Sequence, residues 1–200
     1  MGAAVAIAVA SIVSMFVIIA HNIAAIGRVD VGITAYAQSE PPPGKQFVLH
    51  GPDPRYPGGD PSWPAYARIL TKALEAKGFV PVASSPDLII RVSYRVGDTL
   101  TSVSTTTTPT KHGSTDSTSV STTNLRTIQI EALDAASAAA GKPTVVWSIR
   151  AQSRGTEDSL AKVFPVMVAA MGGYVGVTAE QEVKVSKYYS DPEVASLTQP

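Results

Sequence analysis

The 200-residue chain contains no cysteine and only three histidines. The absence of cysteine excludes disulfide bonds, thiol nucleophiles, cysteine-ligated metals and the lipid-modified cysteine of a bacterial lipoprotein. His21, His50 and His112 are far apart in the sequence and do not have the spacing of a zinc site. We therefore predict that the chain holds no metal and no cofactor.

Charged side chains are also few. They make up 16% of the residues, against about a quarter in an average globular domain. The 16 basic residues balance the 16 acidic ones. Because a nucleic-acid-binding protein needs a basic surface to neutralise phosphates, this balance argues against a nucleic-acid partner. The hydrophobic fraction of 44% is nevertheless enough for a packed core.

Motifs of common catalytic sites are missing from the sequence. It contains no GxxxxGK[ST], GxGxxG, HExxH or GxSxG segment. His112 and Asp116 lie among many serines. That composition resembles a hydrolytic triad, but it lacks the rigid turn and the held base that a serine nucleophile needs. We therefore assign no catalytic residue and expect that the protein is not an enzyme.

The amino-terminal part of the chain is apolar. No charged residue precedes Arg28, and residues 3–26 are almost entirely hydrophobic. A helix of about 20 apolar residues is long enough to span a bilayer, whereas Ala35-Tyr36-Ala37 has the small-x-small pattern that signal peptidase cleaves. Residues 1–37 are thus predicted to be either a signal peptide that ends at Ala37 or an uncleaved membrane anchor. Both alternatives place the remainder of the chain in the periplasm.

The rest of the chain divides into a spacer, a domain and a tail. Prolines and glycines crowd residues 38–62 and predict an extended spacer with tight turns. Within this spacer, residues 46–50 have the pattern of one short strand. Residues 63–190 alternate helix and strand patterns and are predicted to fold as one domain. Residues 191–200 are predicted to be a tail.

Two helices and an antiparallel sheet are predicted in this domain. Apolar residues recur at helical spacing after Ser62 and again after Thr156, and both residues are suitable helix caps. Apolar and polar residues alternate in several other segments, which predicts half-buried strands. Trp147 lies on the apolar side of one of them and is expected to be buried. The strand segments are 79–82, 88–96, 127–134, 144–151 and 182–188.

The predicted fold class is α+β. We expect an antiparallel sheet of four or five strands with two helices packed on one face, preceded by a signal or transmembrane helix. Residues 101–123 form a serine- and threonine-rich insertion in this domain. Their low hydrophobicity favours a flexible loop, whereas the β propensity of threonine favours an extended hairpin that prolongs the flanking strands. The sequence leaves both alternatives open.

Four segments resemble domain-of-unknown-function family 4136. This resemblance extends over about residues 46–187. It implies a bacterial envelope protein that begins with a lipoprotein or secretion signal and carries two helices on an antiparallel sheet, and it implies no catalytic residue. The four segments are Leu74–Phe79 (LEAKGF), Ser85–Tyr94 (SPDLIIRVSY), Val145–Ala151 (VVWSIRA) and Leu160–Pro165 (LAKVFP).

The sequence therefore predicts a non-enzymatic protein of the bacterial cell envelope. We expect a structural or assembly role on the periplasmic side, with another envelope protein as partner. If residues 1–37 are not cleaved, they are expected to contact the membrane. The alternative is a module that binds a small hydrophobic ligand between the sheet and the helix that carries Met167 and Met171.

Overall fold

The structure is a computed structural model that describes residues 27–52, 60–111 and 113–199. Its strands are β1 (Arg28–Ala37), β2 (Gln46–His50), β3 (Val80–Pro81), β4 (Leu88–Thr110), β5 (Gly113–Asp134), β6 (Val145–Gly155) and β7 (Val183–Tyr188). Its α-helices are α2 (Trp63–Glu75), α3 (Ala135–Ala139), α4 (Leu160–Met171) and α5 (Pro192–Thr198). One 3-10 turn, Gly172–Tyr174, follows α4.

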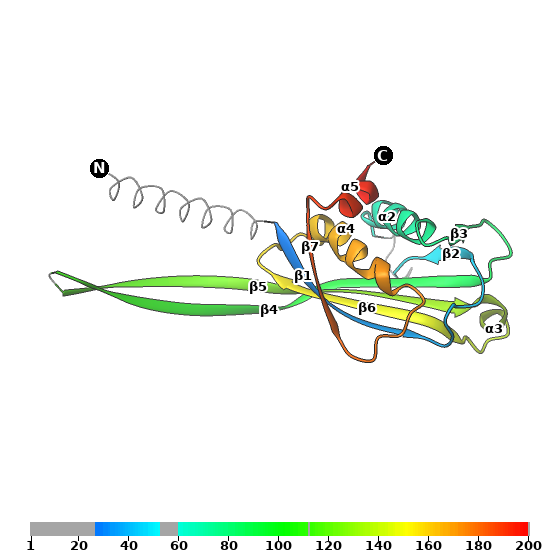
Figure 1. The fold of residues 1–200 in the computed structure, drawn as a ribbon, viewed down its shortest axis with the longest axis horizontal. Helices are drawn as coiled ribbons and strands as arrows, with labels where there is room; N and C mark the ends of the chain where they lie inside the picture. Colours follow the sequence, from blue (N-terminus) through cyan, green and yellow to red (C-terminus); the bar gives the residue numbers. More distant parts are fainter. Residues whose placement is uncertain (1–26, 53–59, 112, 200) are drawn as a thin grey trace, which may run out of the picture.

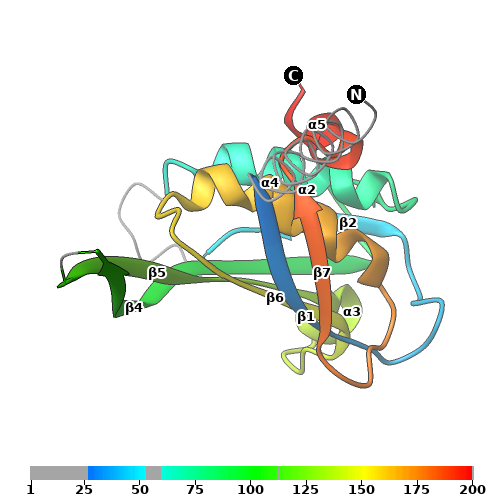
Figure 2. The same cartoon turned by 60° about the vertical axis from the view of Figure 1, so that its left-hand side comes forward.

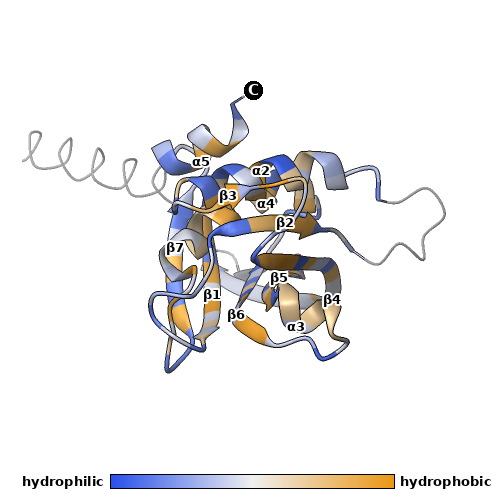
Figure 3. Ribbon diagram, turned by 90° about the vertical axis from the view of Figure 1, so that its right-hand side faces the viewer, coloured by the Kyte–Doolittle hydropathy of each residue, from blue (hydrophilic) through white to orange (hydrophobic). Residues whose placement is uncertain are grey.

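All seven strands belong to one sheet, in the order β3-β2-β4-β5-β6-β1-β7. β2 pairs in parallel with both β3 and β4. Every other pair of neighbours is antiparallel. Helices α2, α4 and α5 lie on the same side of the sheet, and α3 lies in the connection from β5 to β6 (Figures 1 and 3).

The predicted α+β fold, an antiparallel sheet of four or five strands with two helices, is wrong. The sheet has seven strands and is mixed, four α-helices accompany it, and the described chain is mostly β. The parallel pairs arise because β2 is followed by α2, and a chain that crosses over through a helix returns in its original direction. Alternation within a segment identifies a strand, but it does not reveal the neighbours of that strand.

Strand β1 lies in the segment for which the sequence predicts a signal or an anchor. Val29, Val31 and Ile33 are buried on the helix-covered face, as are the two alanines Ala35 and Ala37. β1 is an inner strand, because it pairs with β6 on one side and with β7 on the other. Cleavage after Ala37 would therefore remove a whole inner strand, the one that connects β7 to the rest of the sheet.

The predicted amino-terminal helix, residues 3–26, lies outside the described residues. Within residues 27–52, 60–111 and 113–199, no helix has both the length and the hydropathy needed to span a bilayer.

The folded domain is longer than residues 63–190 at both ends. β2 lies in the predicted spacer, and its Phe47 is buried in the core. α5 lies in the predicted tail, and Val194 and Leu197 attach it to the other helices. Short elements of this kind are weak signals in a sequence, because they become stable only through the surfaces on which they pack.

The Ser85-Pro86-Asp87 segment lies in the connection from β3 to β4 and contacts the start of β2. The Asp87 carboxylate accepts hydrogen bonds from the backbone amides of Lys45 and Gln46, each at 2.9 Å. These two bonds lower the pKa of Asp87. A Cβ atom on Gly44, whose φ is +80°, would approach the Asp87 Cβ to 2.6 Å. The segment thus anchors the parallel strand pair at its start, which is a structural role.

Helix α2 begins at Trp63 as predicted, but Ser62 makes no side-chain capping bond. Asp60 lies at this helix start instead. Its carboxylate accepts a hydrogen bond from the Ser62 amide at 2.8 Å and another from the Tyr94 hydroxyl of β4. The Tyr94 bond, followed by the Ser62 bond, lowers the pKa of Asp60. The start of α2 is therefore tied to the sheet.

Helix α4 begins later than predicted. Its first residue is Leu160, and the expected cap Thr156 lies outside it. Glu157 nevertheless stabilises the start of α4, because its carboxylate accepts a hydrogen bond from the Ser159 amide at 3.1 Å. Pro165 lies inside the helix, which continues past it.

The core lies between the sheet and helices α2 and α4. Trp147 of β6 is completely buried, which confirms the prediction, and its ring centre lies 6.0 Å from that of Phe79. Tyr66 of α2 stacks on Phe164 of α4 with ring centres 4.0 Å apart. Tyr94 of β4 meets Tyr66 edge-on at 4.9 Å. These aromatic contacts join both helices to the sheet.

Candidate functional site

Strands β4 and β5 continue as a two-stranded ribbon far beyond the rest of the sheet (Figures 1 and 2). β2 pairs with β4 only up to Arg91, and β6 pairs with β5 only from Asn124. A bulge in which Asp98 adopts a φ of +49° marks the base of the projecting part. We define the ribbon as residues 99–110 and 113–123. Of the two alternatives for residues 101–123, the structure thus has the extended hairpin.

The two faces of the ribbon differ in chemistry, because successive side chains of a strand point to opposite sides. Over residues 101–105 and 118–122, one face carries pairs of β-branched residues and the other carries pairs of serines. All of these side chains are exposed, so the ribbon has no core of its own. The β-branched pairs are Thr101–Thr122, Val103–Val120 and Thr105–Thr118, and the serine pairs are Ser102–Ser121 and Ser104–Ser119.

Side-chain hydrogen bonds connect the two strands of the ribbon. The hydroxyl groups of Thr105 and Thr118 lie 3.3 Å apart, and the Thr107 hydroxyl donates to the Asp116 carboxylate at 2.6 Å. Cross-strand pairs of this kind stabilise a sheet by about 0.2–1 kcal/mol each. The ribbon is therefore stabilised by a series of such weak contacts and by the backbone hydrogen bonds between its strands, and not by the burial of apolar side chains.

Neither outer edge of the ribbon is paired with another strand of the described residues. The free N–H and C=O groups of such an edge can pair with a further strand, and proteins usually block this with charges, prolines or bulges. Residues 99–123 contain only two charged residues, Lys111 and Asp116, and one proline, Pro109, all towards the tip. The ribbon therefore presents two nearly uncharged edges to which a strand can add.

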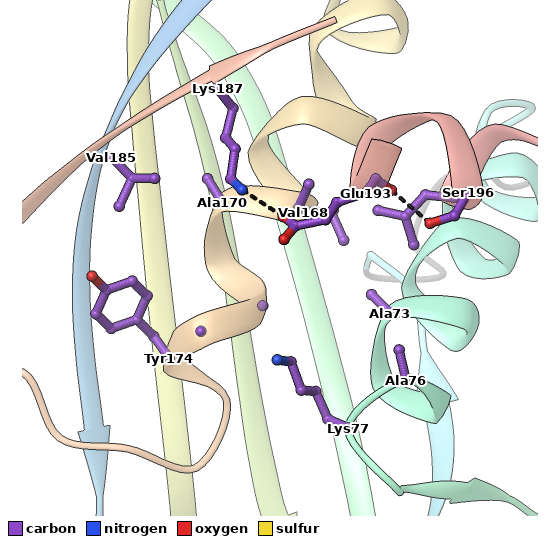
Figure 4. A pocket seen from close by; sticks show the side chains of 14 residues that line it. Ala73, Ala76, Lys77, Val168, Ala170, Tyr174, Val185, Lys187, Glu193 and Ser196 are labelled. Carbon is purple, nitrogen blue, oxygen red and sulfur yellow. Dashed lines mark hydrogen bonds and ion pairs between the residues drawn. The ribbon is translucent and has the colours of Figure 1, made fainter. Parts of the chain in front are cut away.

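A separate groove of about 390 Å³ lies between α2, α4, α5 and β7 (Figure 4). Small side chains such as Ala73 and Ala76 form part of its wall. The Lys187 ammonium group is paired with the Glu193 carboxylate at one side. Lys77 lies across the groove from them and makes no ion pair with a described residue. The groove thus combines an apolar wall with one unpaired positive charge.

This groove is not where the sequence places a ligand. Met167 and Met171 of α4 are buried in the core against the sheet, so packing fills the predicted space. The groove uses a different part of the surface of α4, formed by Val168, Ala169 and Ala170.

A family comparison now adds to this geometry. The model of the family described as "Domain of unknown function (DUF4136)" matches residues 36–189. The chain belongs to the DUF4136 family. The match confirms the resemblance seen in the sequence, and it takes in both the ribbon and the groove-lining helices α2 and α4. The description of the family states no activity.

Comparisons with individual proteins give distant likenesses to the DUF4136 chain. No curated protein matches it. A PDZ domain protein from Parabacteroides distasonis is 13% identical with a TM-score of 0.47; the match covers 80% of this chain but only 39% of that protein. PelC from Paraburkholderia phytofirmans, a dodecamer, is 11% identical in two structures with TM-scores of 0.41 and 0.42. These matches cover 76% and 74% of this chain and 99% of PelC.

The histidines of the DUF4136 chain do not form a cluster in the described residues. His50 lies exposed at the end of β2, and His21 and His112 lie outside the residues that the structure describes. Asp116 is bonded to Thr107 of the ribbon. Over residues 27–52, 60–111 and 113–199, no three His, Asp or Glu side chains are grouped closely enough to bind a metal ion.

Sequence analysis missed one buried charge, Arg126 of β5. This side chain is only 2% exposed, and its Nε atom has no hydrogen-bond partner among the described residues. Burial lowers the pKa of Arg126, although the nearby Tyr189 and Glu157 raise it. The alternation that buries Ile128 also turns Arg126 inward, so extending that pattern by two residues would have revealed it.

Proposed function

We propose that this DUF4136 protein is a non-enzymatic component of the bacterial cell envelope that binds another polypeptide along its ribbon. The observation that carries this proposal is the ribbon with its two unpaired and nearly uncharged edges. Such edges are an aggregation hazard when they stay exposed. The ribbon contributes no buried side chain to the core, so the stability of the fold does not explain why the chain has a ribbon. A role in binding does explain it.

Strand addition is the mode of recognition that suits this surface. An extended peptide that adds to a free edge gains affinity from backbone hydrogen bonds, and the side chains of alternate residues supply the specificity. The exposed Val103 and Val120, which are 65% and 66% exposed, offer apolar contacts on one face. The serines of the opposite face offer hydrogen bonds.

The proposed envelope location rests on the amino-terminal residues. Residues 3–26 have the length and apolarity of a membrane-spanning or export segment. Because β1 begins at Arg28 and is an inner strand, we place any cleavage before Arg28 rather than after Ala37. If the segment remains as an anchor, it holds the domain near the membrane surface on the periplasmic side.

Site-specific crosslinking in cells tests the proposed contact. A photo-reactive amino acid at Thr107 of the ribbon is expected to form an adduct with another polypeptide. The matched control is Thr34, an exposed threonine of β1, where no adduct is expected. The absence of an adduct from Thr107, or equal adducts from both positions, would contradict the proposal.

The groove supports a second candidate function, the binding of a small amphipathic ligand. Its apolar wall suits a hydrocarbon chain, and the ammonium group of Lys77 suits an acidic head group. A molecule of this kind that remains bound to the purified chain in native mass spectrometry would support this candidate.

A further inference from the structure

The ribbon contains the same pentapeptide twice. Residues 101–105 and residues 118–122 both read TSVST, and this sequence is a palindrome. The two copies lie directly opposite each other in antiparallel register. Because the sequence is the same in both directions, each threonine faces a threonine, each serine faces a serine, and Val103 faces Val120. The structure thus shows that TSVST pairs with TSVST.

We infer that the strand that adds to the ribbon is the same strand of a second copy of this chain. Residues 101–105 pair with residues 118–122 on one side, and on the other side they pair with no strand of the part of the chain that the structure describes. On that free side, residues 101–105 of a second copy would reproduce every cross-strand pair that the chain already makes. This inference rests on the proposed function, because it names the polypeptide that binds the ribbon.

The position of the palindrome in β4 fits a two-fold contact. A two-fold axis at Val103 would place Val103 opposite Val103 of the second copy, and Thr101 opposite Thr105 of the second copy. Val103 lies midway between Gly97, at the base of the ribbon, and Pro109, near its tip. The tip of each copy would therefore reach the base of the other, and residues 99–107 of β4, which lie beyond the bulge at Asp98, would pair with the same residues of the second copy.

The free edge of β5 does not permit the same arrangement. A two-fold axis at Val120 would place Gly113 opposite Thr127 of the second copy. β6 already occupies that edge, because Thr127 pairs with Gln152. The contact through β4 is therefore the one that the fold allows. It is also closed, since a two-fold contact uses the same edge of both copies and leaves no such edge for a third.

The nearly uncharged edge supports this occupant. Like charges that face each other across a two-fold axis repel, and residues 99–107 of β4 contain no charged side chain. Threonine and valine also have high β propensity. The segment therefore combines the features that favour pairing and lacks the charge that usually prevents it.

Cysteine crosslinking of the full-length chain tests the inference, since the natural sequence has no cysteine. In the inferred dimer the two Val103 side chains are neighbours, with Cβ atoms about 5 Å apart. The two Val120 side chains are three strand spacings apart, which is about 14 Å. A bis-maleimide too short for the longer distance is therefore expected to convert Val103→Cys, but not Val120→Cys, into a covalent dimer. Val120→Cys is a matched control, because the two valines are equally exposed on the same face.

The register is tested with two further variants. Thr101→Cys alone and Thr105→Cys alone are expected to remain monomers on a denaturing gel, and a mixture of the two is expected to give the dimer. A monomeric Val103→Cys chain, or a dimer of equal yield from Val120→Cys, would overturn the inference. If the inference is overturned in this way but the photo-reactive residue at position 107 forms an adduct with a different protein in cells, the proposed function stands with that protein as the partner. If position 107 forms no adduct, both the proposed function and the inferred self-pairing are contradicted.

Discussion

A chain that starts at Gln38 is expected not to fold, because it lacks all of β1. Val29, Val31 and Ile33 of this strand are buried, and the burial of each such side chain contributes about 1.5–3 kcal/mol. Together they contribute about 5–9 kcal/mol, which is comparable with the whole stability of a typical domain, about 5–15 kcal/mol. β6 would also lose its backbone partner over residues 31–37.

The matched control is a chain that starts at Gly27 and keeps β1. We expect it to unfold in one cooperative transition when heated, as followed by circular dichroism. The chain that starts at Gln38 is expected to show no such transition and to be degraded rapidly by protease. Equal melting temperatures for the two chains would show that β1 is dispensable and would restore Ala37 as the end of the amino-terminal segment.

Trp147→Ala is expected to cost about 3–5 kcal/mol of unfolding free energy, the usual range for truncation of a buried aromatic side chain. Trp147 lies on β6, an inner strand of the sheet, and is fully buried. Its neighbours across the sheet are Ala132 on β5 and Ala37 on β1. Because these side chains are short, they cannot fill the cavity. Denaturant unfolding measures the change.

Trp147→Phe separates the size of this side chain from its polarity. The indole Nε1 atom is buried without a hydrogen-bond partner among the described residues, so phenylalanine sacrifices no hydrogen bond. We expect a smaller cost than for alanine, because phenylalanine leaves a smaller cavity. Because both variants lack Trp147, their unfolding is followed by circular dichroism and not by the fluorescence of this residue. An alanine variant that costs less than about 1 kcal/mol would show that Trp147 does not fill the core.

The long strands and helices could be predicted because their apolar residues recur at regular spacing. The segments 88–96 and 127–134 lie within β4 and β5, the segment 144–151 lies within β6 except for its first residue, and helix α2 begins where expected. β1 shows the same alternation, since Val29, Val31 and Ile33 are separated by polar or small residues. It was not predicted because it directly follows the long apolar run of residues 3–26. The strand was therefore assigned to the same signal or anchor segment as that run.

The remaining features depend on contacts between distant segments. The parallel pairing of β2 with β4 is set by the crossover through α2 and by the Asp87 bonds to residues 45 and 46. The groove is formed by residues of α2, α4, α5 and β7, which are adjacent only after folding. For the ribbon, the palindromic pentapeptide was present in the sequence, and its pairing with itself would have favoured the hairpin over the loop.

The most direct test of the central claim, that the ribbon serves binding and not folding, is to shorten it. Val103 faces Val120, so an Asn-Gly turn can replace residues 104–119 without a change of register. Loop-closure entropy changes by only about 0.6 kcal/mol per doubling of loop length. The account predicts that the shortened chain keeps its melting temperature within a few degrees and loses the protein captured by formaldehyde crosslinking in cells. Loss of the cooperative transition, or unchanged capture by a folded chain, would contradict it.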